Sequence, residues 1–404
     1  MSPIDNPYAP GAGASPPELA GRDEVREAVH IAIMRAARGN AAQNVLLVGL
    51  RGVGKTVLLD RIREDAEAGG IHTVRIESPE KRSLPALLAP QLRLALLRLS
   101  KVDKAKELAT RGLAAIAGFA KSLRVKYHDI EVGLDVAPTA GLADNGDLEQ
   151  DLLALLEAVG EAAQAAKTAL ILFVDEIQYV PEDQLAALIA ALHRVAQRRL
   201  PVLLVGAGLP QLRAKMGNAK SYSERLFTYP LVDALPPTAA ADALTIPAAK
   251  VGVAYTDGAI ESIVQQTRGY PYFLQEWAKH AWDAAQASPI SEADVARASD
   301  ITIAKLDESF FRVRFDRLTP AERRYLRAMA ELGPGPHRSG DIAECLKRGV
   351  TALGPMRSSL IAKGMVWSPA HGDTAFTVPL FDEFMRRTIP GQEWRNEGAT
   401  RPAT

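Results

Sequence analysis

The sequence predicts an α/β protein whose core is a parallel β-sheet covered by helices. Candidate strands recur with helical patterns between them, at residues 44–48, 71–77, 170–174, 201–205 and 227–232. Beyond residue 236 this alternation stops, and residues 237–311 show helical periodicity only. We therefore expect an α/β core over 18–236, a helical lid over 237–311 and a separate domain after it.

Composition indicates a globular protein of the reducing cytoplasm. The 404 residues carry no formal net charge, and 47% are apolar, so two or three packed domains are expected. Cys345 is the single cysteine, which excludes a disulfide within the chain. Residues 1–17 lack a basic start and an apolar run, and predict an extended leader. The leucine-rich stretch 84–100 contains charges and two prolines, so no membrane contact is expected.

The first predicted strand leads into a phosphate-binding loop. Residues 49–56, "GLRGVGKT", fit the spacing G-x-x-x-x-G-K-[ST] at a junction between a strand and a helix. Gly52 and Gly54 permit unusual backbone angles, so that successive N–H groups can surround phosphate oxygens at a helix N-terminus. We expect ATP to bind at the loop and first helical turn, through Gly49, Leu50, Arg51, Gly52, Val53, Gly54, Lys55, Thr56 and Val57.

Three side chains supply the predicted chemistry. Lys55 would neutralise the β and γ phosphates, and the Thr56 hydroxyl would ligate Mg²⁺. The third strand, "LILFVDEIQ" at 170–178, ends in Asp175 and Glu176, and the carboxyl end of such a strand faces the ligand crevice. Asp175 is the second predicted magnesium ligand, and Glu176 the base that activates water. The alternative is a solvated acidic turn, which the upstream phosphate loop disfavours.

A long segment separates the second and third strands. Residues 83–147 exceed an ordinary crossover and carry helical leucine and alanine patterns near 83–99 and 101–123. The sequence therefore predicts a helical insertion, whose role it does not identify.

The order of these motifs, followed by "LLVGAGLPQL" at 203–212, resembles the AAA+ and STAND branches of P-loop ATPases, especially replication-initiator-like and archaeal-type ATPases. "ELAGRDEV" at 18–25 resembles their N-terminal box, which implies that Gly21 and Arg22 lie against adenine. "TRGYPYFLQEWAKHAW" at 267–282 resembles the Gly-x-Pro lid motif of STAND proteins, which implies the same for Gly269 and Pro271.

"SYSERLFTYPLV" at 221–232 resembles the segment whose arginine reaches the nucleotide of a neighbouring subunit, which implies this role for Arg225 and self-association of the chain. The alternative is a structural surface arginine. The chain also departs from the family: Gly206, Ala207 and Gly208 stand where a polar sensor is usual, and Arg268 is the only arginine of the lid motif. Slow hydrolysis and a switch between ATP and ADP states are therefore expected.

Residues 312–390 follow the pattern of a winged helix domain. Helical stretches at 320–331, 339–347 and 350–363 precede a hairpin-like stretch, "GMVWSPAHGDTAFTV". From Arg312 onward the sequence holds 15 Lys or Arg against 10 Asp or Glu, which favours double-stranded DNA as a partner. Arg357 would face the groove, and Lys347, Arg348 and Lys363 would meet phosphates. Residues 391–404 predict a flexible tail.

Two functions remain open at this point. The first is an ATPase whose nucleotide state controls assembly or DNA engagement through the C-terminal domain. The alternative is a signalling switch in which the same domain binds a protein partner. Kinase chemistry is disfavoured because no substrate-phosphorylating residues accompany the loop.

Overall fold

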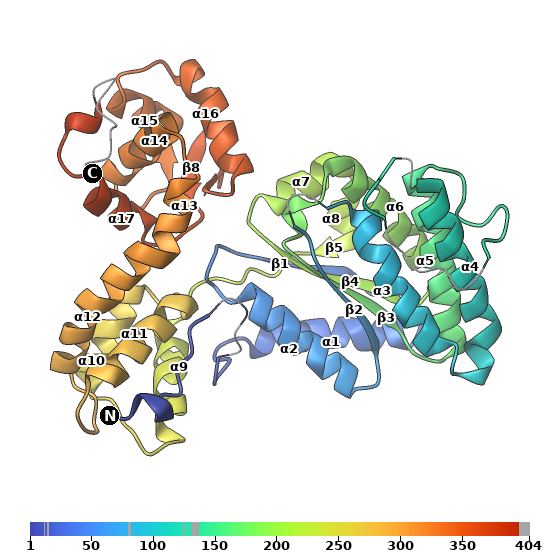
Figure 1. Cartoon of the computed structure of the whole chain (residues 1–404), viewed down its shortest axis with the longest axis horizontal. Coiled ribbons are helices and arrows are strands. Elements are labelled where there is room, and N and C mark those ends of the chain that lie inside the picture. Colours follow the sequence, from blue (N-terminus) through green and yellow to red (C-terminus); the bar gives the residue numbers. More distant parts are fainter. Residues whose placement is uncertain (12, 14–15, 80–81, 124–125, 131–136, 396–404) are drawn as a thin grey trace. The chain divides into compact units, whose positions relative to one another are not determined.

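The computed structural model describes residues 1–11, 13, 16–79, 82–123, 126–130 and 137–395 (Figure 1). Internal contacts divide the chain into two units. The core unit comprises Arg22–Gly49 and Lys55–Val232; the C-terminal unit comprises Met1–Gly21, Leu50–Gly54 and Asp233–Thr404. Within the described ranges, no helix has both the length and the apolar character needed to cross a membrane.

The core unit is built on a parallel five-stranded sheet, as predicted. Its strands lie in the order β2-β3-β4-β1-β5. Their bounds are β1 Asn44–Val48, β2 His72–Glu77, β3 Leu170–Asp175, β4 Val202–Gly208 and β5 Phe227–Thr228. The last strand is shorter than the predicted 227–232. Pro230 has no N–H to donate, and beyond Thr228 the pairing continues only as an isolated bridge between Val48 and Leu231.

The strand register collects the functional ends of the strands at one edge. Glu77 is paired with Asp175, and Val48 with Gly208. β1 lies between β4 and β5, so the chain leaves β1 toward one side of the sheet and later passes β1 to reach β5 on the other. Ligands of open α/β sheets bind at the carboxyl ends of the strands where the order reverses. That place is the end of β1.

Helices cover both faces of this sheet. α1 (Asp23–Ala37) and α2 (Lys55–Ala68) lie on one face, and α3 (Leu84–Leu99), α5 (Leu148–Ala165) and α6 (Glu182–Gln197) on the other (Figure 1). α4 (Lys106–Leu123) packs with α3 and α5 into the same hydrophobic core as Leu46 and Val48 of β1. α3 and α4 lie in the range of the predicted insertion, of which residues 124–125 and 131–136 are outside the described residues; the insertion as a whole remains a prediction. α7 (Leu212–Ala219) and α8 (Ser223–Leu226) complete it.

The C-terminal unit contains four helices in the range for which a lid was predicted, and we keep the name lid for them. Its helices are α9 (Pro237–Ala249), α10 (Asp257–Thr267), α11 (Pro271–Ala284) and α12 (Glu292–Leu306). The leader packs on these helices: Tyr8 is buried and its hydroxyl donates to the Leu244 carbonyl, while the Trp282 indole donates to Ser2 O over 3.0 Å. Contacts of Tyr8 and Trp282 thus hold part of the leader against the helices.

Lid and C-terminal module, which we define as residues 312–390, are joined by continuous helix. α12 passes through a π-helical turn (Asp307–Phe311) into α13 (Arg312–Asp316). The module contains three further helices, α14 (Pro320–Glu331), α15 (Ser339–Cys345) and α16 (Val350–Ala362). The strands β6 (His337–Arg338), β7 (Val366–Trp367) and β8 (Asp373–Phe376) form a small antiparallel sheet in the order β6-β8-β7. The last helix of the module is α17 (Phe381–Thr388). The predicted succession of three helices and a hairpin is present.

The predicted tail is partly packed. Trp394 is buried, and the Arg324 guanidinium donates to its carbonyl oxygen over 3.0 Å. This large indole holds residues 391–395 against α14, whereas 396–404 lie outside the described residues.

Candidate functional site

The phosphate loop has the backbone that its spacing predicts. Between the end of β1 and the start of α2, Gly52 and Gly54 adopt φ values of +80° and +87°, a region that side chains disfavour. α2 begins at Lys55, so its first N–H groups, including that of Thr56, have no acceptor within the helix. These donors and the helix dipole form an anion site at the end of β1.

Lys55 lies inside this loop. Its side chain is buried, and Nζ donates to the Gly49 carbonyl oxygen over 3.0 Å. The Gly49 N–H in turn donates to Gly208 O of β4 over 3.2 Å, which anchors the start of the loop to the sheet. The ammonium group is therefore held inside the loop, and its contact with the phosphates remains a prediction.

The two predicted magnesium ligands are brought together. Asp175 ends β3 with only 2% of its surface exposed, and its carboxylate accepts a hydrogen bond from the Thr56 hydroxyl. Burial raises the pKa of Asp175, while the Thr56 hydrogen bond opposes that shift. The Glu176 N–H also donates to Asp175 Oδ1 over 2.9 Å. A carboxylate beside a hydroxyl offers the hard oxygen ligands that Mg²⁺ prefers, so these residues fit the ion.

Arg75 of β2 is a neighbour of this carboxylate that sequence reasoning missed. Its Nη2 lies 3.4 Å from Asp175 Oδ2, and its Nε donates to Asp60 Oδ1 on α2 over 2.8 Å. Burial acts against the charge, but the hydrogen bond and charge of Asp60, together with Asp175, raise the pKa of Arg75. A charged residue between the buried Val74 and Ile76 was the available signal, but its partner depends on the pairing of β2 with β3.

Glu176 follows in an uncommon backbone conformation. Its φ of +51° is left-handed, which few residues other than glycine adopt outside functional or strained sites. Gln178, two residues later, donates its side-chain amide to Glu176 Oε2. The predicted base is thus held by a neighbouring amide that the sequence analysis did not single out.

The lid motif lies at the phosphate loop. Gly269 has a φ of +71°, and a Cβ there would lie 2.4 Å from the Leu235 carbonyl oxygen, so only glycine fits. Pro271 begins α11, and the N–H of the next residue, Tyr272, donates to Gly52 O over 3.1 Å. Two motifs more than 200 residues apart in sequence therefore meet.

The other two predicted adenine contacts occupy different places. Gly21 has a φ of +66° and packs on α9, where a Cβ would lie 2.7 Å from Ala239 Cβ. Arg22 is buried at the start of α1. The adenine roles of Gly21, Arg22, Gly269 and Pro271 remain predictions.

The C-terminal module also contacts the loop. The Arg51 N–H donates to the Thr377 carbonyl oxygen over 3.0 Å, and Thr377 itself is fully buried just after β8. The Arg51 N–H of the loop is therefore engaged in a hydrogen bond with the C-terminal module.

Arg225 lies on α8 with an exposed side chain. Its backbone oxygen accepts from Gln43 Nε2 over 2.9 Å, which fixes the main chain and leaves the guanidinium at the surface of the core unit. Its reach toward a neighbouring subunit stays a prediction.

Of the predicted DNA contacts, Arg357 and Lys363 bind their own module. Arg357 donates from Nε to Thr374 Oγ1 and from Nη2 to Asp373 O, over 2.8 and 2.7 Å. Lys363 Nζ pairs with the buried Glu322 carboxylate at 2.7 Å. Lys347 and Arg348 are exposed beyond the end of α15. The DNA roles of all four remain predictions, and the first two also hold the fold of the module.

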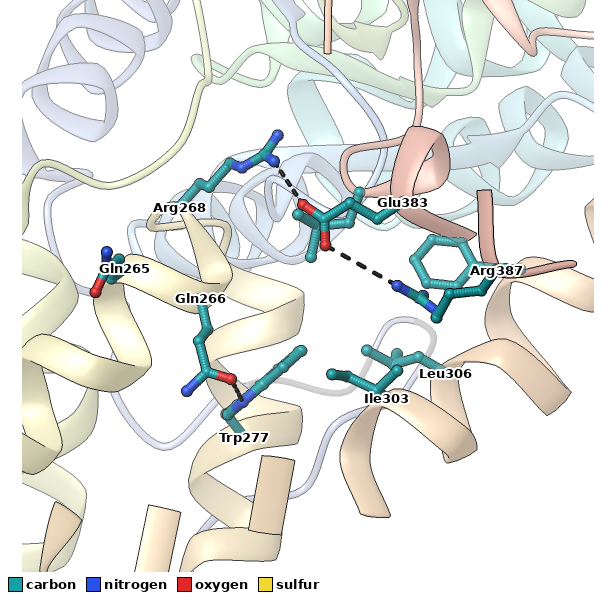
Figure 2. A pocket seen from close by; sticks show the side chains of 10 residues that line it. Gln265, Gln266, Arg268, Trp277, Ile303, Leu306, Glu383 and Arg387 are labelled. Carbon is teal, nitrogen blue, oxygen red and sulfur yellow. Dashed lines mark hydrogen bonds and ion pairs between the residues drawn. The ribbon is translucent and has the colours of Figure 1, made fainter. Parts of the chain in front are cut away.

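A cavity of about 190 Å³ lies between lid helices and α17 (Figure 2). Arg268 extends toward Glu383, and their N···O distance is 2.6 Å; Arg387 approaches the same carboxylate at 4.0 Å. On the opposite wall, the Trp277 indole donates to Gln266 Oε1 over 3.2 Å. The lid arginine is therefore tied to the C-terminal module.

Comparison with known proteins agrees with this geometry. Residues 18–205 match the family model described as AAA ATPase domain, and residues 308–385 match one described as Domain of unknown function (DUF8462). A search of curated proteins finds no match to the chain.

Among solved structures, the Walker-type ATPase of Pyrococcus abyssi is similar in fold. It has a TM-score of 0.57 and 16% sequence identity, covering 91% of this chain and 96% of its own. The Aeropyrum pernix Orc1 protein in complex with DNA has a TM-score of 0.46 at 17% identity, covering 92% of this chain and 94% of its own. The Thermotoga maritima RuvB Holliday junction branch migration motor has a TM-score of 0.44 at 17% identity, covering 94% and 100%.

The phosphate loop, the acid pair ending β3, the parallel sheet and the matched domain model agree. Residues 18–205 therefore match an AAA ATPase domain, and the chain has the fold of a P-loop ATPase of the AAA+ type.

Proposed function

We propose that the protein is a slow, Mg²⁺-dependent ATPase whose nucleotide state controls the docking of its C-terminal module, and thereby the module's engagement of double-stranded DNA. The observation that carries this proposal is the hydrogen bond from the Arg51 N–H to Thr377 O, 3.0 Å long. It joins the phosphate loop to the C-terminal module.

Nucleotide and module compete for the same donor. A phosphate-binding loop acts through its backbone N–H groups, and a donor bonded to Thr377 O is not available to a phosphate oxygen. A single hydrogen bond contributes about 1 kcal/mol, so its loss alone shifts the docking equilibrium by several-fold. Binding of ATP would therefore favour a state in which the module is released from the loop.

The residues of the site supply hydrolysis. Lys55 neutralises the phosphates, and Glu176 orients and deprotonates the attacking water. Thr56 and Asp175 would hold Mg²⁺, which adds positive charge against the β and γ oxygens. Arg75 beside Asp175 balances that carboxylate and fixes its orientation.

Slow turnover follows from what surrounds this site. The end of β4 carries no polar side chain, since Gly206, Ala207 and Gly208 stand there. Arg268 is paired with Glu383 of the module. Arg225 is exposed on its own subunit, so its charge would reach a nucleotide only after self-association.

An aromatic row supports coupling between loop and module. Tyr272, whose N–H donates to Gly52 O, stacks on Phe310 with ring centroids 4.7 Å apart. Phe310 contacts Phe311 at 5.1 Å, and Phe311 stacks on Phe384 of α17 at 5.2 Å. Packed side chains of this kind move as a group, so a shift of the lid motif would be felt at α17.

DNA is the first candidate partner because of the basic excess after Arg312 and the exposed Lys347 and Arg348. A protein partner without DNA is the second. The observation favouring it is that Arg357 and Lys363 are bonded inside the module, so their side chains already have partners within the protein.

The test is binding of a double-stranded DNA by the full chain with ATP, with ADP and without nucleotide, across a salt series. We expect binding with ATP that weakens steeply as salt rises, and weaker binding without nucleotide. Binding that is insensitive to salt, or absent in all three states, would reject DNA and favour the protein partner. Equal binding in all three states would reject control by nucleotide.

A further inference from the structure

We propose that Gln178 is a positioning residue for ATP hydrolysis. β4 ends without a polar side chain, and the Gln178 side chain, which extends from the turn after β3, supplies a polar group there. From this position it holds the Glu176 carboxylate. This inference rests on the proposed role of Glu176 as the base. It concerns only residues of the core unit.

The end of β4 is shaped to admit this side chain. A Cβ on Gly208 would lie 2.7 Å from Gln178 Oε1, closer than real Cβ atoms approach. Gln178 Oε1 accepts the N–H of Leu209, the first residue after β4, over 3.1 Å. The side chain is buried, with 7% of its surface exposed. The absence of a side chain at Gly208 is thus what makes room for Gln178.

The hydrogen bonds fix the direction of the amide. The Leu209 N–H can only donate, so the side-chain oxygen of Gln178 must face it. Its NH₂ group is consequently directed at Glu176 Oε2, to which it donates. Rotating the amide would place two donors together at Leu209 and an oxygen against the carboxylate. Gln178 therefore joins the base to the end of β4 in one orientation.

The turn carrying both residues is held from behind by α7. Lys215 Nζ donates to the carbonyl oxygens of Gln178 and Val180, over 2.7 and 2.5 Å. Burial lowers the pKa of Lys215, and the two carbonyl oxygens satisfy its donors in that partly buried place. With the backbone clamped, the Gln178 side chain has one position from which to reach Glu176.

This arrangement gives the amide a role in catalysis. Glu176 sits in a left-handed backbone conformation, and its side chain is only partly buried, so its rotamer is not fixed by packing. A carboxylate that must accept a proton from one water needs a defined position, and misplacement by about 1 Å can cost on the order of 100-fold in rate. The amide supplies that position through its hydrogen bonds to Glu176 and Leu209.

The experiment is a double-mutant cycle on the full chain, with kcat, KM and ATP affinity measured separately. Gln178→Ala should lower kcat about tenfold or more and leave ATP affinity within twofold. Gly208→Ala should give a similar loss, because its methyl group would lie 2.7 Å from Gln178 Oε1, as well as 2.8 Å from Leu212 Cδ2, so Gln178 must move. The double variant should be no slower than Gln178→Ala, since Gly208→Ala acts through Gln178.

Gln184→Ala is the matched control. Gln184 is also buried in the core unit and its Oε1 accepts a backbone N–H, that of Leu84, over 2.7 Å. Its loss should lower the melting temperature and leave kcat unchanged, because it does not contact Glu176. A Gln178→Ala variant with wild-type kcat, a loss of ATP affinity in place of kcat, or additive losses in the cycle would overturn the inference.

Glu176→Gln, measured in parallel, separates this failure from that of the proposed function. If Glu176→Gln hydrolyses ATP at the wild-type rate, the base assignment fails and the inference with it. If Glu176→Gln is inactive while Gln178→Ala is fully active, only the inference fails. If Gln178→Ala does not fold, Gly208→Ala alone decides: unchanged kcat rejects the proposal.

Discussion

The Lys55 ammonium and the Gly49 carbonyl oxygen lie 3.0 Å apart, so the lysine reaches back across the loop that precedes it. This contact satisfies one donor of a buried cation. ATP would offer the same ammonium group charged oxygens, which form hydrogen bonds roughly twice as strong as neutral ones.

Lys55→Ala should therefore abolish ATP binding or weaken it at least tenfold, which corresponds to about 1.4 kcal/mol. Titration calorimetry with ATP measures this directly. Lys121→Ala, on the exposed side of α4, is the control and should bind like wild type. Unchanged affinity in Lys55→Ala would remove the loop from nucleotide binding.

Glu176→Gln should keep ATP bound and stop hydrolysis, because the amide has nearly the shape of the carboxylate but cannot accept the proton. Phosphate release under single-turnover conditions, at least 100-fold slower than wild type, is the expected result. Glu182→Gln, exposed at the start of α6, should have normal turnover. A hydrolysing Glu176→Gln protein would show that another group activates the water.

Arg225→Ala should reduce turnover without weakening ATP binding if this arginine completes the site of a neighbouring subunit. Mixed with Lys55→Ala protein, it should recover part of the activity, since one intact composite site can form between two different defective subunits. The measurement is ATPase rate against mixing ratio. No recovery, with both variants folded and self-associating, would assign Arg225 a role within its own subunit or in structure alone.

Glu322→Gln should destabilise the C-terminal module. Burial acts to raise the pKa of Glu322, but hydrogen bonds from Lys363, the Thr319 backbone and Ser359 outweigh it and lower the pKa to about 2. The folded value lies below the ordinary 4.5, so the stabilisation is complete above about pH 4.5 and is lost as the pH falls toward 2.

By linkage this contribution is about 3 kcal/mol at neutral pH. Thermal unfolding of Glu322→Gln should show a lower transition at pH 7 and a smaller loss on acidification than wild type. Glu344→Gln, exposed in the same module, serves as control. Equal acid sensitivity of wild type and Glu322→Gln would contradict the prediction.

Replacing Lys347 and Arg348 together by alanine should weaken DNA binding and flatten its salt dependence. Each phosphate that is no longer neutralised removes roughly 0.9 from the slope of log affinity against log salt, so the pair should remove roughly 1.8. Fluorescence anisotropy with a labelled duplex measures both quantities. The control is Lys101→Ala with Lys104→Ala, two exposed cations of the core unit. An unchanged slope would place DNA elsewhere or exclude it.

Features that lie in one short stretch of sequence were predictable. Contacts between residues that are brought together only by the pairing of strands were not. The phosphate loop and the Asp175–Glu176 pair each lie in one short stretch, where strand ends and residue spacing fix the geometry locally. The partnership of Arg75 with Asp175 depends on β2 lying beside β3, which no local pattern encodes.

Gln178 was missed for a related reason. Its bond to Leu209 depends on space left by Gly208 on another strand, and in the sequence that glycine indicated only a missing polar group. Similarly, the basic excess after Arg312 was evident, but only the side-chain hydrogen bonds reveal that Arg357 and Lys363 are bonded within the module.

α12 continues through the π-helical turn into α13 without a break, so the lid and the module are joined by helix and not by a flexible linker. A flexible linker would give the module an effective concentration at the loop set by chain length, and lengthening it would change docking only gradually. With a rigid helical joint, docking depends instead on the rotation of the module about the helix axis. One inserted residue rotates everything after it by about 100°. Small insertions near Phe311 should therefore uncouple the module far more than a long insertion in a surface loop would.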